Sequence, residues 1–309
     1  MHEGVVPLWG HNMTSVTEAN VIDVSARRQA EFSPLRYPGG KSSLTDFFGK
    51  LIDLNFDVRP TYVEPYAGGA GAGLALLLTG RVAHLVLNDL DPAIWALWHG
   101  IVNEPALFRT LVLETPVTLD EWKRQKAIYA GGLDKADVTD LGFATFFLNR
   151  TNRSGVLNAG VIGGQQQQGT YRVDARFNKP TLLHRLDRIA AVRDRIEVLN
   201  GDGLAVIKAR RRQKRTFVYA DPPYYDKGSL LYLNAHTQAQ HEALAASLRR
   251  ATECRWVLTY DDVPEVARLY SGCRVNSYEL NYSAHSTGAK RELMVFSENL
   301  VTEGPGLHT

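Results

Sequence analysis

YVEPYAGGAGAGLALLL, residues 62–78, joins a β-like run to a glycine-rich turn and then to an apolar helix. The run Tyr62-Val63 favours a strand, and Leu74–Leu78 favours a buried helix. Glycines in such a turn let the backbone approach a ligand closely, and the amino terminus of the following helix can hold a polar group. The stretch therefore predicts a ligand-binding α/β unit.

Strand candidates alternate with helical patterns along most of the chain. This alternation predicts a mainly parallel sheet with helices on both faces and ligands beyond the carboxyl ends of the strands. The last two candidates are joined by a Ser/His/Thr/Gly-rich stretch without helical period, which predicts an antiparallel hairpin. We therefore expect an α/β, Rossmann-like mixed sheet of about seven strands. The candidates are Tyr62-Val63, His84–Leu87, Ile196–Leu199, Phe217–Ala220, Trp256–Tyr260, Val275–Leu280 and Leu293–Phe296.

A helical segment interrupts this pattern between residues 104 and 194. Helical stretches such as Leu119–Ala130 and Leu141–Asn149 surround a loop rich in Gly, Gln, Arg and Asn. We expect residues 104–194 to form an inserted, mainly helical subdomain, and residues 31–103 and 195–300 to form one discontinuous α/β domain. Residues 1–30 lack sustained periodicity and are expected to be a flexible arm, with residues 301–309 as a short tail.

Composition excludes several classes of protein. The 309 residues are 44% hydrophobic and 22% charged, as in ordinary soluble globular proteins. Cys254 and Cys273 form no CxxC pair and lie near no histidine cluster, so we expect no disulfide framework, no metal site and a reducing, cytoplasmic setting. No run approaches the roughly 18 to 20 apolar residues that cross a bilayer. The net charge of +2 permits nucleic-acid binding without requiring it.

DPPY, residues 221–224, follows the β-like run Thr216–Ala220. Two prolines stop a strand and lack N–H groups, so the Asp221 and Pro222 carbonyls are left without ladder partners. A carboxylate, a carbonyl and the Tyr224 ring then meet at a strand end, an arrangement that suits a planar amino group. We expect Asp221 to face a pocket and not to be buried in an ion pair. Taken alone, the motif also fits an ordinary Pro-Pro turn with a surface tyrosine.

An acidic residue follows the glycine turn at the offset used in nucleoside sites. Asp89 lies about 20 positions beyond the turn, where a carboxylate binds ribose hydroxyls. The glycines do not follow the GxGxxG spacing, and Glu64 at the strand end would repel a pyrophosphate while favouring a cationic ligand. S-adenosylmethionine therefore fits better than a dinucleotide, with Gly68 and Gly71 beside it.

Several motifs in a fixed order resemble the Dam-like class of adenine-N6-specific DNA methyltransferases. They are RYPGGK (residues 36–41), the EPY-glycine turn (64–73), Asn88-Asp89, Asn149-Arg150 and DPPY (221–224), and the resemblance covers about residues 31–298. It implies a Rossmann-like S-adenosylmethionine-dependent methyltransferase fold with target recognition in the insert. It also implies methyl transfer from S-adenosyl-L-methionine to adenine N6 in a short sequence of double-stranded DNA.

The resemblance assigns cofactor contacts to residues at matching positions. Tyr37 and Lys41 would contact S-adenosylmethionine, Asp89 its ribose, and Asp202 would lie near its adenine. Asp221 would serve both the cofactor and the target base.

The resemblance also implies that Asp221 and the Pro222 carbonyl accept hydrogen bonds from the target amino group. The lone pair of an aromatic amine is delocalised, and two acceptors would orient it, so catalysis needs positioning and electrostatics without a metal. The base must leave the duplex, and Tyr224 would stack on it. Tyr282 either covers the other face or packs at a strand end.

We expect the insert and the loops near the motif to contact DNA. Arginine can bind guanine through two hydrogen bonds, and Gln or Asn can bind adenine. The basic run Lys208–Arg215 is instead expected on the rim opposite the pocket, because it precedes the strand whose far end carries DPPY. The expected DNA contacts are Asn149, Arg150, Asn152, Arg153, Arg172, Lys179, Lys227, His236, Lys290 and Arg291.

Alternatives remain open at this level. The same acceptors could hold the amino group of cytosine, which would make the chain a cytosine-N4 methyltransferase. A low-turnover DNA-binding protein of the same fold is another possibility, and a dinucleotide-dependent oxidoreductase is disfavoured by the glycine spacing. Arg153-Ser154-Gly155 departs from the Asn-Gly pair of well-known members, so the recognised sequence, GATC or another, is open. Whether the chain has a cognate restriction endonuclease or a defence system as a partner is also open.

Overall fold

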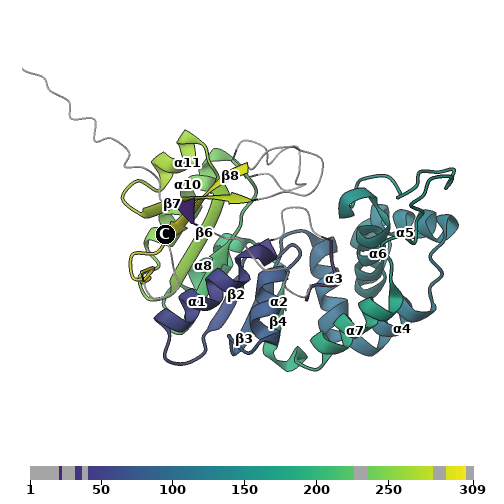
Figure 1. Ribbon diagram of the computed structural model, residues 1–309, viewed down its shortest axis with the longest axis horizontal. Coiled ribbons are helices and arrows are strands. Elements are labelled where there is room, and N and C mark those ends of the chain that lie inside the picture. Colours follow the sequence, from purple (N-terminus) through teal and green to yellow (C-terminus); the bar gives the residue numbers. More distant parts are fainter. Residues whose placement is uncertain (1–20, 23–31, 37–40, 226–235, 281–289, 304–309) are drawn as a thin grey trace, which may run out of the picture.

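The computed structural model describes residues 21–22, 32–36, 41–225, 236–280 and 290–303. An eight-stranded sheet forms its centre, in the order β1-β7-β8-β6-β5-β2-β3-β4 (Figure 1). The strands are β1 (Val21–Ile22), β2 (Thr61–Glu64), β3 (His84–Asn88), β4 (Ile196–Leu199), β5 (Thr216–Ala220), β6 (Arg255–Asp261), β7 (Arg274–Leu280) and β8 (Lys290–Phe296).

The α/β fold expected from the sequence is confirmed, and all seven predicted strands are present. Strands β2 to β6 pair in parallel, whereas β8 lies between β6 and β7 and is antiparallel to both. Within the segment expected to be a flexible arm, Val21–Ile22 form β1 and pair in parallel with β7. This edge strand is too short to show periodicity.

Helices surround the sheet and extend from one end of it. Figure 1 shows α4 to α7 together at the end of the molecule that lies away from β7 and β8. In the described residues the α-helices are α1 (Thr45–Asn55), α2 (Gly71–Leu78), α3 (Pro92–Asn103), α4 (Pro105–Glu114), α5 (Leu119–Gly131), α6 (Val138–Thr151), α7 (Lys179–Ala190), α8 (Gly203–Arg210), α10 (Gln238–Arg249) and α11 (Pro264–Leu269). Short 3-10 helices are η1 (Lys41–Leu44), η2 (Gly132–Asp134), η3 (Arg153–Gly155) and η4 (Arg193–Arg195).

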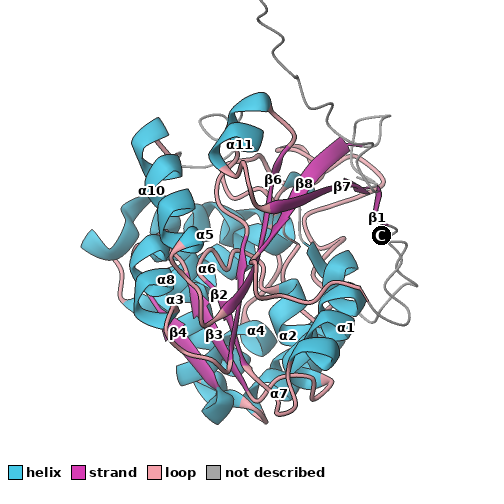
Figure 2. Cartoon of the chain, turned by 90° about the vertical axis from the view of Figure 1, so that its left-hand side faces the viewer, coloured by secondary structure: helices cyan, strands magenta, loops and turns pink. Residues whose placement is uncertain are grey.

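Each face of the sheet has its own hydrophobic core, because side chains alternate along every strand. In β5, Phe217 and Tyr219 pack on one face, and Val218 and Ala220 on the other. The first core includes α1 and α2, and the second includes α8, α10 and α11. Figure 2 shows these two sets of helices on opposite sides of the strands.

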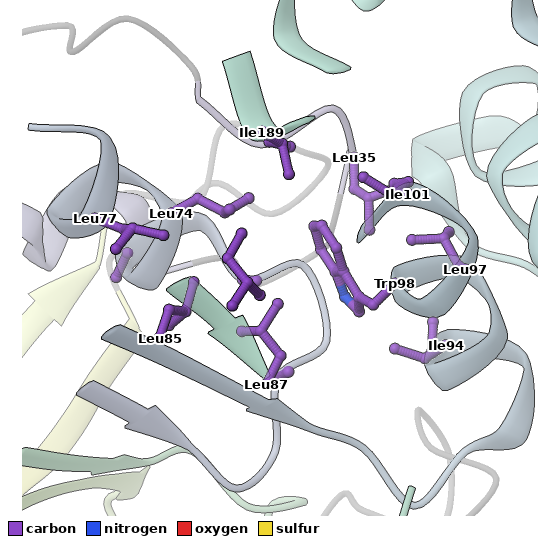
Figure 3. Packing of buried hydrophobic residues seen from close by; sticks show 14 of the residues in the cluster. Leu35, Leu74, Leu77, Leu85, Leu87, Ile94, Leu97, Trp98, Ile101 and Ile189 are labelled. Atoms are coloured by element: carbon purple, nitrogen blue, oxygen red, sulfur yellow. The ribbon is translucent and has the colours of Figure 1, made fainter. Parts of the chain in front are cut away.

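The first core continues into the helices that follow β3. Trp98 of α3 lies beside Leu35 and Leu87 in a closely packed group (Figure 3). Farther along, Phe146 of α6 packs with its ring centroid 5.5 Å from that of Phe108 and 5.7 Å from that of Phe177. The helices between residues 105 and 190 are therefore held by aromatic packing that is continuous with the sheet. Within the described residues, no helix has both the length and the apolar character needed to cross a bilayer.

The contact between α3 and α6 depends on Gly142. A Cβ atom at this position would lie 2.3 Å from the Ala96 carbonyl oxygen. Alanine normally stabilises a helix interior by roughly 0.5–1 kcal/mol relative to glycine. We expect Gly142→Ala instead to lower the free energy of unfolding by about 1–3 kcal/mol in urea titrations, because the overpacked helices must separate.

Gly49 in α1 provides the matched control, because its added Cβ would meet only the Arg81 guanidinium, at 3.7 Å. Gly49→Ala should raise the free energy of unfolding by up to about 1 kcal/mol. If Gly142→Ala and Gly49→Ala both raised the free energy of unfolding, the close contact between α3 and α6 at Gly142 would be contradicted.

Candidate functional site

Acidic side chains gather where the parallel strands end. Glu64 is the last residue of β2, Asp221 follows β5, and Asp261 is the last residue of β6. Asp89 follows β3 directly. Because these strands run in parallel, their carboxyl ends meet at one edge of the sheet, where open α/β sheets bind ligands.

The Asp221 carboxylate is held by an ammonium group and a hydroxyl. Lys41 Nζ, from η1, lies 3.1 Å from Oδ1 and 3.0 Å from Oδ2, and Thr259 Oγ1 donates to Oδ1 at 2.7 Å. The Asp221 side chain is 24% exposed, whereas that of Lys41 is only 4% exposed. The expectation that Asp221 lacks an ion pair is therefore wrong. A carboxylate offers about four acceptor positions, and these contacts use three, so Oδ2 keeps capacity for another donor.

A second buried carboxylate, Glu292 of β8, shares Lys41. Its Oε2 lies 3.5 Å from Lys41 Nζ and accepts a hydrogen bond from the Tyr278 hydroxyl. Its Oε1 accepts from the Tyr224 hydroxyl at 2.5 Å. Glu292 thus fixes the ring of the DPPY tyrosine, whose centroid lies 5.8 Å from Lys41 Nζ. Burial raises the pKa of Asp221, the Glu292 charge raises it further, and Lys41 and Thr259 lower it.

Sequence reasoning missed Glu292 and Thr259. Glu292 reaches the site because β8 inserts between β6 and β7, which brings it opposite Asp261. A carboxylate next to the apolar run Leu293–Phe296 is a weak sequence signal for a buried, functional group. Thr259 offers no such signal, because threonine is common in strands.

The structure brings the glycine turn and Asp89 together. Gly68 adopts a φ of 44°, and its N–H donates to Asp89 Oδ2 at 2.9 Å. Asp89 Oδ1 accepts from the Asp91 N–H at 3.0 Å. Burial raises the pKa of Asp89 to about 6, although these N–H bonds oppose the shift. Gly71 is the first residue of α2, directly after this turn.

Glu64 lies beneath the turn and holds α2. It is 4% exposed, and its Oε1 accepts from the Gly73 N–H at 2.9 Å. Burial raises the pKa of Glu64 to about 8; the Gly73 bond opposes this shift, and the Asp221 charge adds to it. Asp202 is exposed and caps α8 through the Leu204 N–H at 3.0 Å.

Three of the expected DNA contacts are internal. Asn149, Arg150 and Asn152 are 3%, 9% and 1% exposed. Asn152 accepts from Trp122 Nε1 at 2.7 Å and donates to the carbonyls of Val156 and Leu157. Arg150 donates to the Arg176 carbonyl, and Asn149 binds the backbone of Arg36. The prediction that these three residues face DNA is wrong, because their side chains are buried and donate to backbone carbonyls.

Two further expected contacts also have internal partners. Lys179 Nζ donates to the carbonyls of Leu113 and Thr115, at 2.7 and 2.8 Å, where α4 ends. The prediction that Lys179 contacts DNA is corrected, because its ammonium group binds these carbonyls. His236 is half-buried, with its ring centroid 5.7 Å from that of Tyr66 and 5.3 Å from that of His241, and burial lowers its pKa. A neutral ring in an aromatic cluster is poorly suited to a phosphate.

The remaining expected residues are exposed or outside the described part of the chain. Arg153, Arg172 and Arg291 are exposed. Tyr37, Lys227, Tyr282 and the Lys290 side chain lie outside the described residues. The basic run Lys208–Arg215 lies at the amino end of β5, at the end of the strand away from Asp221, and Arg210 pairs with Glu197. No group of three potential metal ligands occurs among the residues that the structure describes.

Comparison with known families agrees with this geometry. A model of the D12 class N6 adenine-specific DNA methyltransferases matches residues 37–292. The matched range includes Lys41, the glycine turn, Asp89 and the DPPY motif, and it spans most of the 309 residues. A separate comparison with curated proteins found no match. The chain belongs to the D12 class of N6 adenine-specific DNA methyltransferases.

Proposed function

We propose that this adenine-specific DNA methyltransferase uses S-adenosylmethionine and acts on an adenine swung out of double-stranded DNA. Asp221 and the Pro222 carbonyl hold the N6 amino group, and Tyr224 stacks on the base. The observation that supports this most directly is the Asp221 carboxylate, which is oriented by Lys41 and Thr259 and keeps one acceptor position.

The strand ends suit the proposed cofactor. When bound, S-adenosylmethionine supplies an electrophilic methyl group on a sulfonium centre. Asp89 offers carboxylate oxygens to ribose hydroxyls, and the turn around Gly68 permits close backbone approach. Burial raises the pKa of the Glu64 carboxyl group to about 8, so at neutral pH this group supports the turn through its hydrogen bond from Gly73 and does not repel a ligand by its charge. Lys41, Tyr37 and Asp202 remain proposed cofactor contacts.

The chain's own groups would prepare the amino nitrogen for attack. Its lone pair is delocalised into the purine ring, and hydrogen bonds from both N–H groups to Asp221 and Pro222 localise and orient that pair. Unstacking a base costs a few kcal/mol, and stacking on Tyr224 offsets about 1–3 kcal/mol of it. The Tyr224 hydroxyl donates to Glu292, and this hydrogen bond keeps the Tyr224 ring in one orientation.

Lys41 has a second proposed role, which is to keep Asp221 charged. Burial raises the pKa of Asp221, and Lys41 is the largest influence that lowers it. An ionised acceptor forms a stronger hydrogen bond to an amino group than a neutral one. We place Arg153, Arg172 and Arg291 as contacts to DNA because they are exposed.

Substitution of Asp221 tests the proposed function. Asp221→Asn keeps the size of the side chain but removes its charge, so we expect the methyl-transfer rate to fall by at least about 10²-fold with the fold intact. The measurement is nucleoside mass spectrometry of DNA treated with purified protein and labelled S-adenosylmethionine. Wild-type protein should yield N6-methyladenine.

Asp194→Asn is the matched control, because Asp194 is 95% exposed and lies before β4, at the opposite end of the sheet. Its activity should equal that of the wild type. N4-methylcytosine as the product would overturn the proposed base, and full activity of Asp221→Asn would overturn the proposed role of that residue.

The raised pKa of Asp89 predicts a pH dependence of cofactor binding. Only the ionised carboxylate can accept from two hydroxyls, and its pKa of about 6 means that this form dominates above that pH. The affinity for S-adenosylhomocysteine should be full near neutral pH and should fall by up to about tenfold per unit as the pH drops below 6. Isothermal titration calorimetry from pH 5 to 8 measures this.

Asp89→Asn should bind S-adenosylhomocysteine weakly and lose most of the pH dependence. An unchanged slope in this variant would assign the titration to another group and remove Asp89 from the ribose site.

A further inference from the structure

The Asn149 side chain binds a backbone segment far away in sequence. Its Oδ1 accepts from the Arg36 N–H at 2.8 Å, and its Nδ2 donates to the Arg36 carbonyl at 3.0 Å. The same Nδ2 donates to the Gly155 carbonyl at 3.0 Å. The amide therefore holds both polar groups of one residue, much as a neighbouring strand would. Residues 33–36 are called the bridging segment below.

Gly155, in η3, packs against the backbone of Arg36. It has a φ of +75°, and an added Cβ would lie 2.0 Å from the Arg36 carbonyl oxygen. Because the obstructing atom belongs to the backbone, no side-chain rotation relieves the contact. Helix α6 and the turn after it thus position the Arg36 backbone by polar and steric contacts, and the Arg36 guanidinium also donates to the Asn152 carbonyl at 3.3 Å.

The other end of the bridging segment reaches the glycine turn. Ser33 Oγ donates to the Gly69 carbonyl at 2.7 Å, next to the Gly68 N–H that binds Asp89. Arg185 of α7 donates to the Ser33 carbonyl at 2.9 Å, and Arg150 donates to the Pro34 carbonyl at 3.4 Å. The helices that follow β3 are thereby connected to the turn through one short segment.

We propose that Asn149 and Gly155 are positioning residues for the cofactor site, acting through the bridging segment on the glycine turn. This rests on the proposed use of S-adenosylmethionine. Their contacts end on backbone atoms, so they determine where the segment lies and read no base. Displacing Arg36 shifts Ser33, which releases Gly69 and loosens the turn that positions Asp89. Cofactor affinity is then set partly by the helices outside the sheet.

Helix α6 does not need these contacts to stay folded. Phe143, Phe146 and Phe147 are buried in the first core and pack against Phe108 and Phe177. Loss of the Asn149 side chain therefore leaves the helix packed while removing the two hydrogen bonds that this side chain makes to the Arg36 backbone. An effect of Asn149 on cofactor binding can therefore be measured separately from an effect on the stability of α6.

The test compares Gly155→Ala with Gly272→Ala. Both glycines have a positive φ, +75° and +85°, but an added Cβ at Gly272 meets nothing within 4 Å. The two variants therefore share backbone strain, and only Gly155→Ala displaces Arg36. Titration calorimetry with S-adenosylhomocysteine should show at least about tenfold weaker binding for Gly155→Ala, the change expected when one or two hydrogen bonds are lost. Gly272→Ala should bind like the wild type.

Asn149→Ala provides a second route if Gly155→Ala fails to fold, and the same loss of affinity is expected. Fluorescence anisotropy without cofactor should show DNA affinity within about twofold of wild type for both variants. At saturating cofactor, the rate should recover while the KM for the cofactor stays raised. Unchanged cofactor affinity, or loss of DNA affinity alone, would overturn the proposal. Failure of the wild-type chain to bind S-adenosylhomocysteine would instead overturn the proposed cofactor.

Discussion

One buried ammonium group, that of Lys41, is shared by two carboxylates from different strands. Asp221 follows β5 and Glu292 lies in β8, and both are within 3.5 Å of Lys41 Nζ. Two carboxylates this close repel each other, and burial adds a cost of several kcal/mol for each unpaired charge. Lys41 offsets both effects. Without it, the pKa of Asp221 would rise, and the protonated form of Asp221 is the weaker acceptor.

The arrangement of the strands makes this shared charge possible. Strand β8 must lie between β6 and β7 for Glu292 to reach Lys41 and the Tyr224 hydroxyl. The antiparallel hairpin at the sheet edge thus supplies a residue to a site that the parallel strands alone would leave incomplete. The glycine turn is held in a comparable way, by Trp98 Nε1 on the Gly68 carbonyl and by Ser33 on the Gly69 carbonyl.

Local patterns in the sequence predict the fold and the outline of the site. Strand periodicity finds β2 to β8, and the rule that ligands bind at carboxyl ends brings Glu64, Asp89 and Asp221 to one edge. The Lys41–Asp221 pair is different, because 180 positions separate its members and only the tertiary structure brings them together. The contact of Glu292 with Lys41 cannot be predicted from the sequence for the same reason.

Polar residues of α6 show where sequence patterns mislead. Asn149 and Asn152 have the chemistry of base-reading residues, and their hydrogen bonds to the protein backbone cannot be seen in the sequence. Lys179 likewise caps α4 through two carbonyls. In each case a donor expected to reach DNA is used instead by a carbonyl of the protein backbone.

A titration of the carboxyl groups by NMR tests the role of Lys41 most directly. Protein labelled with ¹³C at the aspartate and glutamate carboxyls would be followed from pH 4 to 9 in the wild type and in Lys41→Met, with Asp221→Asn and Glu292→Gln used for assignment. The shared-charge account predicts that the pKa of Asp221 rises when Lys41 is replaced, because the opposing charge is lost. An unchanged pKa in Lys41→Met would contradict it.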